Sequence, residues 1–198
     1  MKNNYFLKDN YKSRDKYVHY NDQNETDDWQ LEIYLHALGL MKKNKLSKVC
    51  DIGCGSGYKL VTYLGEYKTI GLELDENLDF LKNKYPKKKW LESDFTKNYD
   101  LDVDVLICSD VIEHLVNPNE LIEYIKKINF KYLVLSTPER DLVYPKDSKY
   151  LDGPPRNPAH QREWNFNEFK DYISQYFNII DHRVTNLHQA TQMIICTK

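Results

Sequence analysis

Short apolar runs recur along the chain and alternate with segments whose apolar residues repeat at helical spacing. An apolar run of about four to eight residues bounded by turn residues is typical of a buried strand, whereas helical spacing is typical of an amphipathic helix. The predicted strands are Val49–Ile52, Thr69–Leu74, Trp90–Leu91, Val103–Cys108 and Tyr132–Ser136. The predicted helices are, approximately, Asp27–Lys43, Tyr58–Leu64, Glu76–Lys84 with Asp75 as its cap, Pro118–Ile128 and Asn167–Gln175.

The regular alternation of strands and helices predicts an α/β fold with a mainly parallel sheet and helices on both faces. Two further apolar runs, Phe177–Val184 and Gln189–Thr197, are too close together for a helical crossover. We therefore expect them to pair as a C-terminal antiparallel hairpin. We also expect a single domain over residues 1–198, in which residues 1–45 form an N-terminal arm and helix and residues 138–164 form a long loop.

Composition narrows the class of protein. Hydrophobic residues make up 41% and charged residues 29% of the chain, which is usual for a soluble globular protein. The net charge of −2 gives no overall attraction to nucleic acid or anionic membranes, and no apolar run approaches the ~20 residues of a membrane span. The polar N-terminus lacks the apolar core of a secretory signal, and the four cysteines form no CxxC pair. We expect a cytoplasmic protein with reduced thiols.

A glycine-rich turn follows the first predicted strand. The run from Val49 to Gly57 reads VCDIGCGSG, a GxGxG pattern with Asp51 two residues before its first glycine. Glycine permits positive φ and lets a ligand lie against the backbone, and the start of the next helix offers free N–H groups. The dinucleotide fingerprint GxGxxG would need a glycine where Tyr58 stands, and no GK[ST] follows to make a Walker A loop.

This turn resembles motif I of class I S-adenosylmethionine (SAM)-dependent methyltransferases. Three later segments resemble that family's next motifs in the same order: Thr69–Asp75, Glu92–Phe95 and Asp104–Leu115. The resemblance spans Leu46–Lys198 and implies a Rossmann-like fold with a seven-stranded sheet, SAM as cofactor and methyl transfer as activity.

The same resemblance assigns roles to individual residues. The carboxylate of Glu73 would accept the ribose hydroxyl protons, Asp94 would meet the adenine amino group, and Phe95 would cover the ring. The full set of cofactor-binding residues that it implies is Asp51, Gly53, Gly55, Gly57, Glu73, Leu74, Asp94, Phe95 and Ser109.

The run from Asp110 to His114 carries three polar residues, Asp110, Glu113 and His114, which share one face if the run is helical. It is similar to the acidic-x-x-Glu-His run of ubiquinone-biosynthesis O-methyltransferases and of small-RNA 3′-end methyltransferases, some of which hold a divalent metal there. Asp110 has a shorter reach than the Glu of the metal-binding pattern, so we assign no metal ligand and expect catalysis without a metal.

Two histidines are candidates for a catalytic base, since histidine has a suitable pKa for this work. His114 follows the fourth strand, beside the expected methyl site, and His160 lies in the segment Pro138–Trp164. That segment holds five of the seven prolines, and long loops of this kind are often functional. In this fold the segment builds the acceptor side, and we expect it to close over the acceptor.

The same loop holds the candidate acceptor-binding residues Arg140, Arg156, Arg162 and Glu163. It resembles bacterial methyltransferases linked to surface-glycan and sugar modification, and arginines suit a phosphate-bearing acceptor. We expect O-methylation of a sugar or sugar nucleotide. The alternatives are O- or N-methylation of a quinone-like phenol or another small metabolite, and a catalytically silent SAM-binding protein. Tyr58 and the terminal hairpin disfavour an NAD-dependent oxidoreductase, and we expect no nucleic-acid or membrane partner.

Overall fold

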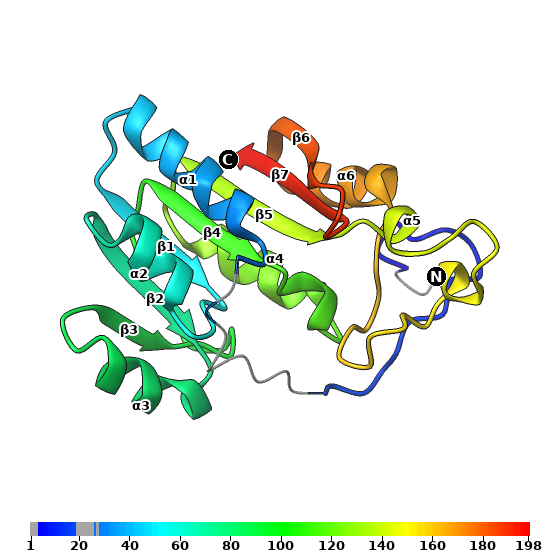
Figure 1. The fold of residues 1–198 in the computed structure, drawn as a ribbon, viewed down its shortest axis with the longest axis horizontal. Coiled ribbons are helices and arrows are strands. Elements are labelled where there is room, and N and C mark those ends of the chain that lie inside the picture. Colours follow the sequence, from blue (N-terminus) through cyan, green and yellow to red (C-terminus); the bar gives the residue numbers. More distant parts are fainter. Residues whose placement is uncertain (1–3, 19–25, 27) are drawn as a thin grey trace.

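The computed structural model describes residues 4–18, 26 and 28–198, and it contains one seven-stranded sheet with the order β3-β2-β1-β4-β5-β7-β6 (Figure 1). Strands β1 to β5 are parallel, and β7 pairs antiparallel with both β5 and β6. The predicted Rossmann-like α/β fold with its C-terminal hairpin is confirmed. The strands are β1 (Lys48–Ile52), β2 (Lys68–Glu73), β3 (Lys89–Glu92), β4 (Val105–Ser109), β5 (Tyr132–Pro138), β6 (Asn178–Asn186) and β7 (Thr191–Thr197).

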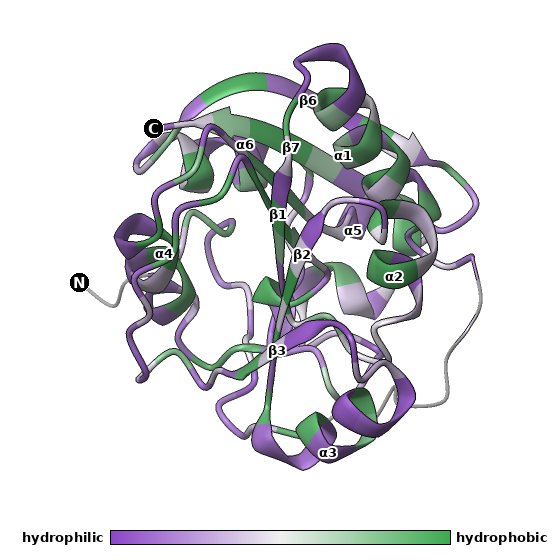
Figure 2. Cartoon of the chain, turned by 90° about the vertical axis from the view of Figure 1, so that its left-hand side faces the viewer, coloured by the Kyte–Doolittle hydropathy of each residue, from purple (hydrophilic) through white to green (hydrophobic). Residues whose placement is uncertain are grey.

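Two apolar layers enclose the sheet because successive side chains of a strand point to opposite faces. In β4, Val105 and Ile107 pack with three helices on one face, while Leu106 and Cys108 pack with two helices on the other. Figure 2 shows hydrophobic stretches along the central strands between these helices. The first face is covered by α1 (Leu31–Lys43), α2 (Tyr58–Leu64) and α3 (Asp75–Lys84), and the second by α4 (Pro118–Lys127) and α6 (Phe166–Ser174).

Some predicted boundaries were wrong. Asp75 is the first residue of α3 and not its cap, which is Leu74. Helix α1 begins at Leu31, after Gln30 in a left-handed conformation, and the predicted start at Asp27 lies outside the described residues. The long loop also contains two short helical turns that its sequence did not indicate, α5 (Arg140–Val143) and η2 (Lys149–Asp152).

Strand β1 lies between β2 and β4, so the order of the parallel strands reverses beside it. At such a reversal the segments that follow two neighbouring strands turn to opposite faces and leave a crevice at the carboxyl ends of the strands. The glycine-rich turn follows β1 and the Asp110–His114 run follows β4. The fold therefore brings the two most informative segments of the sequence to the same crevice.

The N-terminal arm, residues 4–18, lies against the long loop (Figure 1). Lys12 donates its backbone N–H to the Asp152 carbonyl at 2.8 Å, and Arg14 donates its own to the Gln161 carbonyl, also at 2.8 Å. None of the helices formed by the described residues is long and apolar enough to cross a membrane.

Two glycines test the packing of the first face. A Cβ on Gly71 would overlap the ring of Trp90 and lie 2.8 Å from Cys54 Sγ, whereas a Cβ on Gly39 of α1 would meet nothing within 4 Å. We expect Gly71→Ala to lower the free energy of unfolding by about 1–3 kcal/mol through overpacking. Gly39→Ala, the matched control, should raise it by about 0.5–1 kcal/mol. Urea denaturation measures both values, and equal effects of the two substitutions would contradict this packing.

Candidate active site

The turn after β1 needs glycine where it is most crowded. Gly53 has φ 69° and Gly57 has φ 68°, conformations that residues with a Cβ rarely adopt. A Cβ on Gly53 would overlap Val111, and one on Gly57 would lie 2.8 Å from both Leu81 and Trp90. The backbone is thus packed closely against the segment after β4 at Gly53, and against α3 and β3 at Gly57.

Glu73, at the end of β2, binds this turn directly. Its Oε2 accepts the Gly55 N–H at 2.7 Å, and its Oε1 accepts the Leu74 N–H at 2.8 Å. The carboxylate is buried, so these charge-assisted hydrogen bonds are shielded from water. One side chain therefore joins the carboxyl ends of β1 and β2.

Asp51, inside β1, is fully buried and accepts a hydrogen bond at 2.9 Å from the hydroxyl of Tyr34 on α1. Asp94, after β3, is exposed, and its Oδ1 accepts hydrogen bonds from the Thr96 hydroxyl at 2.6 Å and the Thr96 N–H at 2.9 Å. These bonds lower the pKa of Asp94 and keep it ionised. Next to it, the ring of Phe95 packs against the ring of Tyr124, with the ring centroids 5.5 Å apart.

Two cavities open onto the carboxyl ends of the strands. The smaller, of about 360 Å³, is lined by Glu73, Leu74, Asp94 and Phe95 among others. The larger, of about 600 Å³, is lined by side chains from α1, the end of β4, the long loop and the β6–β7 turn. Gly53, Asp110 and His114 line both cavities, so the two spaces meet between the ends of β1 and β4.

Some of the expected cofactor residues line these cavities, and the others shape the backbone around them. Gly53 lines both cavities, and Ser109 lines the larger one. Asp51, Gly55 and Gly57 line neither cavity and instead shape the turn.

The Asp110–His114 run is not one helix, so the condition for the predicted shared face is not met. Asp110 has φ 52°, and a 3-10 turn, η1 (Ile112–His114), begins only after it. Asp110 Oδ1 accepts from the Ser136 hydroxyl at 2.6 Å, and its Oδ2 accepts from Gln30 Nε2 at 2.8 Å. Burial raises the pKa of this carboxyl. The two oxygens of Asp110 are therefore bonded to β5 and to the residue that precedes α1.

Glu113 is fully buried. Its Oε2 accepts from the Thr137 hydroxyl at 3.1 Å, while its Oε1 has no hydrogen-bond partner among the described residues. Burial, and then the charge of Asp110, raises the pKa of Glu113 well above its usual range. A buried carboxyl with an unpartnered oxygen is costly, and such a group usually serves a purpose other than stability.

His114 is held as a neutral ring. Its Nδ1 lies 3.2 Å from the Ala159 carbonyl oxygen, and because a carbonyl can only accept, Nδ1 carries the proton. Burial, and then the proximity of His160, lowers the pKa of His114 to about 3.

His160 has a partner at each ring nitrogen. Nδ1 lies 2.6 Å from Glu163 Oε1, and Nε2 lies 3.0 Å from Asn157 Nδ2. Asn157 Oδ1 already accepts the Ala159 N–H at 3.0 Å, which fixes the orientation of the amide so that its NH₂ group faces His160. The proton of His160 is thus on Nδ1, toward the carboxylate, and Nε2 carries the lone pair.

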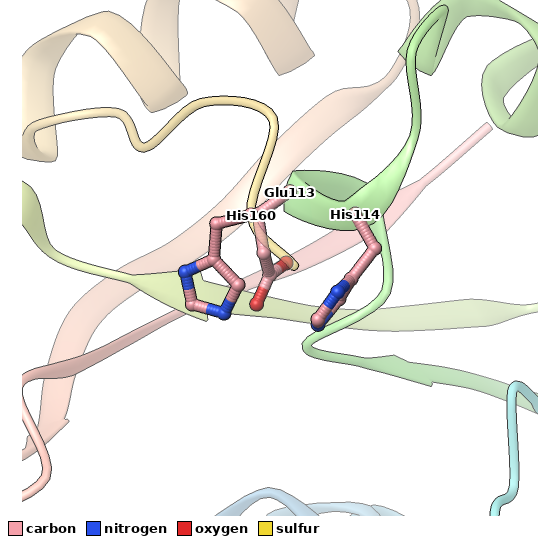
Figure 3. Close-up of side chains that lie close together, drawn as sticks. All are labelled: Glu113, His114 and His160. Carbon is pink, nitrogen blue, oxygen red and sulfur yellow. The ribbon is translucent and has the colours of Figure 1, made fainter. Parts of the chain in front are cut away.

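Glu113, His114 and His160 form the one group of candidate metal ligands that the described part of the chain contains (Figure 3). One ligand atom from each lies within 4.8 Å of the others, and the two rings meet edge to face with centroids 4.8 Å apart. Both histidines direct Nδ1 at an oxygen acceptor, which is the usual arrangement behind a metal-binding Nε2. The group contains His160 in place of Asp110.

The four expected acceptor-binding residues separate into two pairs. Arg156, which is exposed, and Glu163 line the larger cavity. Arg140 is buried and forms a bidentate pair with Glu168 at 2.6 and 2.9 Å.

Arg162 is also buried and donates to the carbonyl oxygens of Leu115 and Val116, both at 2.7 Å. Neither Arg140 nor Arg162 lines a cavity, so both hold the loop to the fold instead of facing an acceptor.

Sequence reasoning missed several residues of the site. Gln30, Tyr34 and Asn157 all reach the crevice from segments distant from the motifs. For Asn157, the spacing Asn-x-x-His before His160 was a usable signal, since Asn favours turns that bring such residues together. Gln30 and Tyr34 had no such signal, because only the docking of α1 on the sheet brings them to Asp110 and Asp51.

The comparisons with known proteins agree with this geometry. The family model Methyltransf_23, described as a methyltransferase domain, matches residues 25–183. A search of curated proteins finds no match.

Among solved structures, the methyltransferase domain of bacterial CtHen1 is 18% identical, with TM-score 0.62, over 85% of this chain and 99% of that one. A SAM-dependent methyltransferase from Clostridium acetobutylicum is 14% identical, with TM-score 0.64, over 84% and 91%. One from Aquifex aeolicus is 18% identical, with TM-score 0.61, over 86% and 93%. At these identities the likenesses show the shared fold. The match of the family model over most of the chain shows more: the chain belongs to this methyltransferase domain family and is a SAM-dependent methyltransferase with SAM as its cofactor.

Proposed function

We propose that this enzyme methylates an oxygen atom of a small polar acceptor, with a sugar or a sugar nucleotide as the first choice. The observation that carries the proposal is the junction of the two cavities at Gly53, Asp110 and His114, with His160 in the wall of the larger one. A methyl group at that junction would face an acceptor in the larger cavity, whose volume of about 600 Å³ fits a small molecule.

The smaller cavity is where we place the adenosine part of SAM. Glu73 would accept hydrogen bonds from the ribose hydroxyls, Asp94 would accept one from the adenine amino group, and Phe95 would pack on the ring. SAM supplies the reactive methyl on a sulfonium, and the protein has to orient the acceptor and exclude water.

His160 is our candidate for the general base. Its Nε2 lone pair would take the acceptor hydroxyl proton as the oxygen–methyl bond forms and the sulfur–methyl bond breaks, leaving S-adenosylhomocysteine. The acceptor hydroxyl would replace the Asn157 amide as the partner of Nε2. Glu163 would hold the ring in this tautomer and stabilise the imidazolium that forms.

His114 is the weaker candidate. Its environment lowers its pKa to about 3, so the ring has little tendency to take a proton near neutral pH. Its place in both cavities suits it better to contact the methyl donor or the acceptor as a neutral ring.

The wall of the larger cavity supports a polar, anionic acceptor. Lys59 and Arg156 lie in it, together with the amide side chains of Gln30, Asn157 and Gln189. Cationic side chains suit a phosphate, and several amides suit a ligand with many hydroxyls. A quinone-like phenol would suit a more apolar cavity.

Metal-assisted transfer is the second candidate, favoured by the unpartnered Oε1 of Glu113 beside two histidines whose Nδ1 atoms are already engaged. Glu113, His114 and His160 would hold a divalent cation, which supplies Lewis-acid activation of the acceptor oxygen. Asp110 lies outside this group of ligand atoms, and its two oxygens accept from Ser136 and Gln30.

A screen of SAM consumption against sugar nucleotides, catechols and short RNAs tests the acceptor class. Turnover confined to sugar nucleotides or sugars supports the proposal, and turnover confined to catechols or RNA rejects it. The same assay with a chelator, and with Mn²⁺ added back, separates metal-free from metal-assisted transfer. Mn²⁺ that raises the melting temperature of the wild type but not of Glu113→Gln would establish the metal centre.

Glu73 is the first residue to test for cofactor binding. We expect Glu73→Ala to weaken the binding of S-adenosylhomocysteine by roughly 1.5–3 kcal/mol for each charge-assisted hydrogen bond lost. Calorimetry measures the affinity, with Asp75→Ala as a control, since Asp75 is acidic, exposed and outside both cavities. NAD should not bind the wild type. An unchanged affinity in Glu73→Ala would show that the ribose carboxylate is misassigned.

The buried carboxyl of Glu113 should make the stability of the protein depend on pH. Its folded-state pKa is raised, so its contribution to stability is complete below about 4.5 and is lost as the pH rises toward the folded-state value. Glu113→Gln cannot ionise, and it should gain stability relative to the wild type by about 1.4 kcal/mol per pH unit over that interval. Denaturation with a chelator present measures this gain. Glu123→Gln, on the exposed side of α4, should show none. A pH-independent difference for Glu113→Gln would contradict the raised pKa.

The base assignment makes a kinetic prediction. His160→Ala should lower turnover by about 10²–10⁴-fold while leaving SAM affinity nearly intact. His114→Ala should have the smaller effect on turnover, and His188→Ala serves as the control because His188 is exposed at the wall of the same cavity. Near-normal turnover in both His160→Ala and His114→Ala, measured on the true acceptor, would mean that proximity and desolvation suffice.

A further inference from the structure

The N-terminal arm makes its densest contacts with the part of the long loop that carries His160. Beyond the backbone bond between Arg14 and Gln161, the Gln161 side chain donates to the Lys16 carbonyl at 2.9 Å, and the Glu163 N–H donates to the Tyr11 hydroxyl at 3.0 Å. These contacts join residues about 150 positions apart in the sequence, and their loop partners lie one and three residues after His160. The arm is therefore part of the support of the candidate base.

The guanidinium of Arg14 is the centre of these contacts. Its Nη1 donates to the carbonyl oxygens of Asn157 at 3.0 Å and His160 at 2.8 Å, and its Nη2 donates to the Pro155 carbonyl at 2.6 Å. A planar guanidinium presents several donors in a fixed fork, which one ammonium group cannot reproduce. One side chain of the arm thus fixes three carbonyl groups of a six-residue turn.

That turn sets the geometry of the imidazole. Within it, the His160 N–H donates to the Asn157 carbonyl at 3.2 Å, the Ala159 N–H fixes the Asn157 amide, and this amide faces His160 Nε2. On the other side, the Gln161 N–H donates to the Glu113 carbonyl at 2.7 Å. A shift of the turn would therefore move the ring relative to Glu113, Glu163 and the junction of the cavities.

We propose that Arg14 is a positioning residue for His160: by binding the carbonyls of Pro155, Asn157 and His160, it holds the imidazole in the tautomer and orientation that methyl transfer uses. The catalytic meaning of this placement rests on the proposed function of His160, whereas the placement itself does not. Arg14 touches neither cavity. It acts only through the turn.

The test compares Arg14→Ala and Arg14→Lys with Lys8→Ala in the full chain. Lys8 is the matched control because it pairs with Asp152 at 2.7 Å, which pins the same arm to the same loop away from the His160 turn. Hydrogen exchange of the Ala159, His160 and Gln161 amides reports the turn, and long-range ¹⁵N NMR reports the His160 tautomer. Melting temperature and the binding of S-adenosylhomocysteine check that each variant keeps its fold.

We expect exchange at these three amides to become about tenfold faster or more in Arg14→Ala, with loss of the Nδ1–H preference of His160. Arg14→Lys should show an intermediate effect, and Lys8→Ala should match the wild type. Millimolar guanidinium should restore protection in Arg14→Ala. S-adenosylhomocysteine affinity should stay unchanged in all three variants, and kcat on an identified acceptor should fall in Arg14→Ala with little change in SAM KM.

Wild-type exchange and wild-type ¹⁵N shifts of His160 in Arg14→Ala would overturn the proposal. Equal effects of Arg14→Ala and Lys8→Ala would also overturn it, since they would assign the turn to the arm as a whole. If Arg14→Ala does not fold, wild-type exchange and shifts in the folded Arg14→Lys would count against the proposal, and faster exchange with altered shifts there would support it. Should Arg14→Ala displace His160 while His160→Ala keeps normal turnover, Arg14 still positions the ring and the base assignment alone fails.

Discussion

The reversal of strand order between β1 and β4 is the constraint on which the site depends. The chain leaves β1 toward the face covered by α2 and leaves β4 toward the face covered by α4. Two adjacent parallel strands thus end without a covering connection between them, and polar groups from both can point into one space. Gly53 and Asp110, the residues just past these strands, line both cavities for this reason. Everything else at the site, including the arm and the long loop, is built around that gap.

The crevice holds more buried acid than stability alone would favour. Asp51, Glu73 and Glu113 are all buried, and Asp110 adopts a left-handed conformation. The fold offsets part of this cost with neutral or backbone donors: Tyr34 for Asp51, two backbone N–H groups for Glu73, Thr137 for Glu113. The offset is incomplete at Glu113, where one oxygen has no partner among the described residues. Unsatisfied and strained groups collect where a protein uses them, and here they lie around the junction of the two cavities, where we propose that donor and acceptor meet.

The sequence predicted the features that depend on local pattern. It did not predict those that depend on contacts between segments far apart in the chain. The apolar runs predicted the succession of strands and helices along the chain, because a buried parallel strand must be apolar on both faces, and the glycine spacing located the turn that Glu73 binds. The helical continuity that would put Asp110 and His114 on one face is absent, because Asp110 adopts a left-handed conformation and bonds to Ser136 and Gln30. Arg140 and Arg162 were predicted to bind the acceptor because of their charge. Their guanidinium groups instead donate hydrogen bonds to Glu168 and to two backbone carbonyls inside the fold. The contact of Arg14 with the His160 turn crosses about 145 positions, and no local pattern encodes it.

The two histidines of the cluster differ in the group that each Nδ1 contacts, and this difference suits them to different roles. Their ring centroids are 4.8 Å apart and both lie near the buried Glu113. His114 nevertheless donates to a backbone carbonyl, whereas His160 donates to a carboxylate. A carbonyl carries no net charge, so it offers little to a ring that gains a proton, and burial keeps His114 neutral. A carboxylate lies 2.6 Å from Nδ1 of His160, so in the proposed base role the proton taken at Nε2 would have a compensating charge three residues away. Because the turn that carries His160 is held by the arm and not by the sheet, the difference between the two histidines depends on a segment that lies outside the strands and helices of the fold.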